Sequence, residues 1–115
     1  MDYSAVYLAL SVCSAVGLLI IAIAIPLAIG KIGRNHFYGF RTPRTLSSDE
    51  IWYPANRLAA VNLIFAGLFI WIAAIVLFFI KTQMPPQTVV IIMAVLTIAA
   101  IFFAVIKSFL SLRKL

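Results

Sequence analysis

Acidic residues are almost absent from this chain: Asp2, Asp49 and Glu50 are the only three in 115 residues. Charged residues of both signs make up 10% of the sequence, whereas soluble domains carry about 25%. Hydrophobic residues reach 65%, and the mean hydropathy is +1.17. This composition excludes an ordinary soluble domain and predicts a membrane protein. The length allows one small bundle and leaves no room for a separate soluble catalytic domain.

Residues that carry catalytic or metal chemistry are equally scarce. Cys13 stands alone, so no internal disulfide can form, and its place in an apolar run indicates a small buried residue. His36 has no second histidine, cysteine or carboxylate at ligand spacing, so no metal site is expected. Gly-rich phosphate loops, serine elbows and paired histidines are absent, so we expect neither enzyme activity nor a cofactor. No carboxylate lies inside an apolar run, which argues against a proton-coupled multidrug exporter.

The apolar residues fall into three long runs. The run from 3 to 30 has no charged residue, the run from 58 to 80 has Asn62 as its only strongly polar member, and the third begins at 88. Each is long enough for a helix to cross a hydrocarbon core of about 30 Å. We therefore predict an all-α membrane protein with three transmembrane helices. The expected spans, within a single domain over 1–115, are about 4–30, 58–80 and 88–110.

Prolines and glycines indicate where these helices bend or end. Pro26 should kink the first helix near its carboxyl end, and Gly30 and Gly33 favour its termination. Pro85 and Pro86 forbid continuation of the second helix and predict a tight reversal before the third.

Small residues recur along two of the predicted spans and would let helix backbones approach closely. They are Ala5, Ala9, Cys13 and Gly17 in the first span, and Ala100, Ala104 and Ser108 in the third. We favour packing within one chain for the first stripe; the alternative is the seam of a homo-oligomer. Asn62 needs a partner in hydrocarbon, and an interhelical hydrogen bond is favoured over a substrate contact.

The segment 31–57 holds most of the polar chemistry. It carries five of the nine basic residues, two of the three acids and a group of aromatics. Ser47 to Glu50 reads as a capping box, with Ser47 capping and Glu50 reaching back, so a short interfacial helix should begin there. Its Trp52 would lie at the headgroup boundary, and Pro54 should bend its entry into the second span.

Upstream of that helix, residues 35–43 are too rich in glycine and aromatics for a helix interior, and we predict an ordered loop. Gly39 should adopt a backbone conformation that other residues avoid. Arg41 could brace the loop, contact a lipid phosphate or receive an acidic ligand, and we favour bracing.

The polar residues of this segment closely resemble the signature of the SdpI family, bacterial integral membrane proteins named after an immunity factor against a secreted toxin. The matching residues are Asn35, Gly39, Phe40, Arg41, Thr42, Pro43, Thr45, Leu46, Trp52, Asn56 and Arg57. The hydrophobic helices agree as well, so the resemblance covers essentially the whole chain. It implies immunity to a peptide toxin, with a second role in holding a transcriptional repressor at the membrane.

Two other classes of function stay open beside this one: a small oligomeric channel or transporter, and a membrane-embedded enzyme acting on lipid-linked substrates. We expect the binding surface to lie in the central segment. The candidate ligand- or partner-binding residues are Asn35, Gly39, Arg41, Thr42, Thr45, Trp52, Asn56 and Arg57.

The distribution of basic residues predicts the orientation of the chain. The net charge is +6, but the basic residues flank the apolar runs, which fits anionic lipid headgroups better than direct nucleic-acid binding. The positive-inside rule is satisfied when the amino end and the Pro85–Pro86 turn lie outside, with the central segment and carboxyl end in the cytoplasm. The resemblance implies the cytoplasmic membrane of a bacterium.

Overall fold

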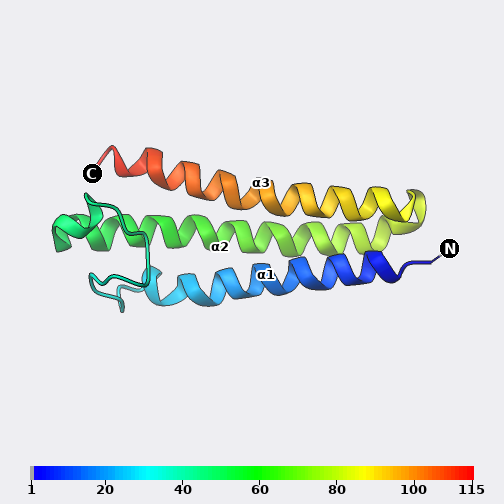
Figure 1. Ribbon diagram of the computed structural model, residues 1–115, viewed down its shortest axis with the longest axis horizontal. Coiled ribbons are helices and arrows are strands. Elements are labelled where there is room, and N and C mark those ends of the chain that lie inside the picture. Colours follow the sequence, from blue (N-terminus) through cyan, green and yellow to red (C-terminus); the bar gives the residue numbers. More distant parts are fainter. Residues whose placement is uncertain (1) are drawn as a thin grey trace.

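The computed structural model describes residues 2–115, in which three long helices lie side by side (Figure 1). The helices are α1 (Ser4–Ala28), α2 (Asp49–Ile80) and α3 (Pro86–Leu112), with short 3₁₀ turns η1 (Thr45–Ser47) and η2 (Lys81–Gln83). The bundle measures 56 × 23 × 19 Å, with α2 between the other two helices in the view of Figure 1. The loop between α1 and α2 and the C-terminus share one end, which we call the loop end.

All three helices are long and apolar enough to cross a membrane, as predicted. At 1.5 Å per residue, α2 is about 48 Å long, well beyond a hydrocarbon core of about 30 Å. The helix is therefore longer than the core that it crosses. The helix continues through Pro54 without a break, so the expected interfacial helix and the second span form a single helix. The protein is a multi-pass membrane protein.

The first helix ends where the glycine pattern predicted. Gly30 has a φ of +73°, a left-handed conformation that a residue without a side chain adopts freely. The Gly30 amide donates to the Leu27 carbonyl (3.3 Å) and the Lys31 amide donates to the Pro26 carbonyl (2.9 Å). This pair of bonds is a Schellman motif, which satisfies carbonyls that would otherwise lack partners at the helix end.

Close packing between α1 and α2 centres on two glycines. A Cβ added to Gly67 would lie 2.8 Å from the Gly17 carbonyl oxygen, so only glycine permits this approach. The predicted stripe is therefore correct at Gly17, whereas Ala5 is exposed and the adjacent Val6 is buried in its place. Beside the glycine contact, the Trp71 indole N–H donates to the Ser14 carbonyl (2.9 Å).

Asn62 has the interhelical partner that its place in an apolar span required. Its side-chain amide donates to the Ser108 hydroxyl oxygen (3.1 Å), and that hydroxyl donates to the Ala104 carbonyl (2.7 Å). Asn62, Ala104 and Ser108 are all buried. The predicted hydrogen bond is confirmed, and it joins α2 to α3.

Candidate functional site

The segment that precedes α2 is held by a capping box, at a position that the sequence analysis did not assign. The Thr42 amide donates to Thr45 Oγ1 (2.7 Å), and the Thr45 amide donates to Thr42 Oγ1 (3.0 Å). This reciprocal pair satisfies two amides at the start of a helical turn, with Pro43 in the first position, where a missing N–H is tolerated. Thr45 is completely buried.

The capping box predicted at Ser47–Glu50 is wrong. The helix begins at Asp49 with Ser48 in the N-cap position, and no side chain caps it. The Ser47 hydroxyl instead donates to the Arg44 carbonyl within η1. The preceding 3₁₀ turn thus already engages the hydroxyl that was expected to cap α2.

Gly39 and Asn56 fix the loop against the first turns of α2. Asn56 Oδ1 accepts a hydrogen bond from the Phe40 amide (2.6 Å), and its Nδ2 donates to the carbonyls of Phe40 (3.3 Å) and Trp52 (3.0 Å). Gly39 has a φ of +115°, and a Cβ there would lie 2.7 Å from Asn56 Oδ1. The glycine is therefore required both for its backbone conformation and for space.

Two further side chains of α2 tie it to the chain that leaves α1. The Trp52 ring is fully buried, and its indole N–H donates to the Ile32 carbonyl (2.8 Å). The Arg57 Nε–H donates to the carbonyl of Ala28 (3.2 Å), which is the last residue of α1. Both contacts join segments that are more than fifteen residues apart.

Asn35 forms the turn at the tip of the loop. Its Oδ1 accepts from the amides of Phe37 (2.8 Å) and Tyr38 (2.6 Å), while its Nδ2 donates to the carbonyls of Gly33 (2.8 Å) and Tyr38 (2.9 Å). Side chains of this kind stabilise turns by replacing backbone partners. Seven of the candidate residues thus each make a contact that shapes the loop, and we call them the loop network: Asn35, Gly39, Thr42, Thr45, Trp52, Asn56 and Arg57.

Like Gly39 and Arg57, Arg41 is exposed. Its guanidinium donates to the His36 carbonyl, which agrees with the bracing role that the sequence analysis favoured. Beside it, Phe37 is 92% exposed, and His36 is exposed too. We call these three residues the exposed rim of the loop.

Several structural residues of the loop were missed by the sequence analysis. Arg34 donates to Asp49 (2.9 Å) and to the Leu46 carbonyl (3.2 Å), and the Tyr38 hydroxyl donates to the Ile23 carbonyl. The ion pair is exposed and adds about 0–1 kcal/mol. No local pattern predicts these contacts, because each partner lies at least twelve residues away.

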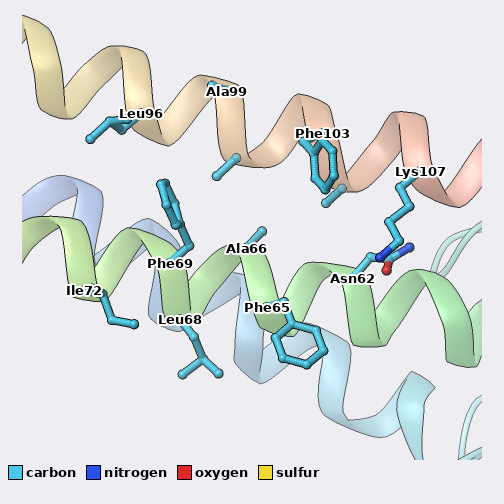
Figure 2. Close-up of a pocket in the computed structure, with 12 residues that line it drawn as sticks. Asn62, Phe65, Ala66, Leu68, Phe69, Ile72, Leu96, Ala99, Phe103 and Lys107 are labelled. Atoms are coloured by element: carbon cyan, nitrogen blue, oxygen red, sulfur yellow. The ribbon is translucent and has the colours of Figure 1, made fainter.

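A groove of about 720 Å³ opens between α2 and α3 (Figure 2). Its lining combines alanines with phenylalanines, and Asn62 and Lys107 provide polar groups near the loop end. The full lining is Asn62, Phe65, Ala66, Leu68, Phe69, Ile72, Leu96, Ala99, Ala100, Phe103, Ala104 and Lys107. In the predicted small-residue stripe of α3, Ala104 and Ser108 are buried and Ala100 is half-buried, and both alanines border this groove.

Comparison with known proteins agrees with this architecture. The sequence profile of the SdpI/YfhL protein family matches residues 31–107, which include the loop network, α2 and most of α3. The chain belongs to the SdpI/YfhL protein family. It is 32% identical over 82 residues to the protein named Immunity protein SdpI of Bacillus subtilis (strain 168).

The family match is narrower than the sequence resemblance suggested, because it begins at Lys31 and leaves α1 outside. The alignment to Immunity protein SdpI covers 71% of this chain but only 36% of that relative. This chain therefore corresponds to about a third of the relative's length. No solved structure matches the sequence.

Proposed function

We propose that this SdpI-family protein gives a bacterial cell immunity to a secreted antimicrobial peptide toxin. The observation that carries the proposal is the 82-residue alignment with Immunity protein SdpI, supported by the family match over 31–107. The matched region contains the whole hydrogen-bonded loop and the exposed rim. The proposed role is binding, with no catalytic step.

Within this proposal the loop network and the exposed rim have separate tasks. The network holds the backbone of the loop, and the polar side chains of Asn35, Thr45, Trp52 and Asn56 already have partners within the chain. The rim residues His36, Phe37 and Arg41 extend from this scaffold. An exposed aromatic ring beside an arginine is a common composition for a protein contact surface.

We also propose that the rim faces the cytoplasm, in a bacterial cytoplasmic membrane. The loop end has basic residues on both the loop and α3, whereas Lys81 is the only basic side chain at the opposite end within residues 2–115. The positive-inside rule then favours a cytoplasmic loop end. In this orientation the rim could also capture a transcriptional repressor, which would add signalling to immunity.

The immunity proposal is tested by expressing the chain in a bacterium that the toxin kills. Cells with the chain should survive toxin concentrations that kill cells with the empty vector. If membrane-inserted protein gives no added survival against any toxin that Immunity protein SdpI resists, the proposal is wrong. Repressor capture is tested separately, by whether the partner moves to the membrane fraction when the chain is present.

A further inference from the structure

The five arginines of the chain divide into two groups. Three of them, Arg34, Arg41 and Arg57, donate side-chain hydrogen bonds to acceptors on the chain itself. The guanidinium groups of Arg44 and Arg113 have no hydrogen-bond or ion-pair partner within the described residues 2–115. A planar guanidinium offers five donors, so these two groups have unused capacity for an anion.

Arg44 and Arg113 line the same pocket although they lie far apart in the sequence. The pocket, of about 410 Å³, lies between the start of η1 and the last turns of α3. Its remaining lining is apolar: Ile106, Phe109, Leu110 and Leu112. Two cationic groups thus border an apolar surface at the loop end of the bundle.

The loop network fixes the position of Arg44 over α3. Arg44 lies inside the turn closed by the reciprocal Thr42–Thr45 hydrogen bonds, next to the fully buried Thr45. The Phe40 ring packs edge-on against the Phe109 ring, with centroids 4.9 Å apart. These contacts hold the loop against α3, so the pocket is built into the fold.

The charges around the pocket favour an anionic occupant. Lys107 and Lys114 lie on or just beyond the same turns of α3. Of the two acids at this end, Asp49 is paired with Arg34 and Glu50 is exposed on α2, and neither lines the pocket. An occupant with a negative group beside the arginines would meet no nearby carboxylate in the lining.

The apolar part of the lining indicates what the rest of the occupant must be. Phe109 and Leu110 are half exposed at the end of a membrane-spanning helix, where acyl chains meet headgroups. Basic pockets of this kind beside transmembrane helices bind anionic lipid headgroups. We propose that Arg44 and Arg113 form a binding site for one anionic phospholipid, with its phosphate between the guanidinium groups and an acyl chain along Ile106, Phe109 and Leu110. An acidic peptide would match the charges but not the acyl-chain surface.

The site is tested on the purified full chain in detergent by native mass spectrometry and thermal unfolding. The probes are phosphatidylglycerol, phosphatidylcholine of the same acyl chains, glycerol phosphate and a hexaglutamate peptide. Wild type should retain one phosphatidylglycerol and should unfold at a higher temperature with it than with phosphatidylcholine. Glycerol phosphate and the peptide should have little effect.

Arg44→Gln and Arg113→Gln should each weaken phosphatidylglycerol binding at least about tenfold, since each removes charge-assisted hydrogen bonds to the phosphate. Lys114→Gln should weaken it much less, because that side chain contributes only a longer-range attraction. Lys114→Gln is the matched control, because Lys114 neighbours Arg113 but does not line the pocket. Circular dichroism in lipid-free detergent checks that all three variants fold. The proposal would be overturned if the three variants lost phosphatidylglycerol binding equally, or if wild type bound the two lipids equally. It would also be overturned if glycerol phosphate or the peptide bound more strongly than phosphatidylglycerol.

Discussion

The backbones of Gly17 and Gly67 lie so close that Gly67 has no room for a side chain, and a Cβ at Gly17 would require its neighbours to shift by a few tenths of an ångström. A Cβ on Gly17 would lie 3.2 Å from the Gly67 carbonyl oxygen and 3.1 Å from Trp71 Cδ1, and one on Gly67 would lie 2.6 Å from Ile21 Cγ1. In lipid, helices associate through close packing more than through hydrophobicity. This contact is therefore a principal attachment of α1 to the rest of the bundle.

Gly17→Leu should separate α1 from α2 and destabilise the folded protein by about 1–3 kcal/mol, as overpacking of a filled interface does. The measurement is thermal unfolding in detergent. Ala15→Leu is the matched control, since Ala15 lies on the same helix and is exposed. If Gly17→Leu unfolds at the wild-type temperature, the α1–α2 packing described above is wrong.

Gly39→Ala should loosen the loop while leaving the three helices intact. The added Cβ would approach Asn56 Oδ1 and would force alanine into a φ of +115°, a strain of about 1–3 kcal/mol. Hydrogen exchange measures the effect directly, because the Phe40 amide donates to Asn56 Oδ1 and should lose protection.

Gly33→Ala serves as the control for that experiment. Its backbone φ is not positive, and its nearest neighbour would be the Tyr53 hydroxyl at 3.4 Å, an ordinary contact. Equal protection of the Phe40 amide in Gly39→Ala and Gly33→Ala would contradict the assigned role of Gly39.

Much of the fold could be predicted from the sequence, because the features that determine it depend on single residues or short segments. Apolar runs determine three spans, Gly30 ends α1, and Asn62 in an apolar helix must find a hydrogen-bond partner. That Ser108 would be this partner was not predicted, because it depends on how α2 and α3 align. The packing of α1 was only partly predicted, since a repeat of small residues does not indicate which of them faces a neighbour.

The loop was predicted as ordered, but the hydrogen-bond partners of its residues could not be assigned from the sequence alone. Thr42 and Thr45 are three positions apart and form a capping box, yet Ser47 and Glu50 match the usual pattern better. Trp52 reaches back twenty residues to the Ile32 carbonyl. Such contacts depend on the path of the chain between them, which no residue pattern records. Whether the eight candidate residues bind a partner stays a prediction.

The proposed orientation predicts which end of the bundle reacts with reagents outside the cell. In a Cys13→Ala background, Gln83→Cys should be labelled in intact cells by a thiol reagent that cannot cross the membrane, because it lies at the α2–α3 turn and is exposed. Ser47→Cys, also exposed, lies at the loop end and should react only after the cells are opened. The reverse labelling would place the exposed rim outside the cell.

In the proposed function, the rim provides protection while the loop network only positions it. Arg41→Lys keeps the charge but loses the planar fork of donors, and Phe37→Ser removes a ring that is 92% exposed. Both variants should therefore reach the membrane and unfold at temperatures near wild type. Trp52→Ala, in contrast, should lower stability by about 3–5 kcal/mol, because its ring is fully buried.

The most direct measurement is survival of toxin-sensitive cells that express wild type, Arg41→Lys or Phe37→Ser at equal membrane abundance. Lys31→Gln serves as a control at an exposed position of the same segment, outside the rim and outside the proposed lipid site. Both rim variants should lose most of the protection that wild type gives, while Lys31→Gln should keep it. Full protection by both rim variants would contradict the proposal and would place the activity outside the rim.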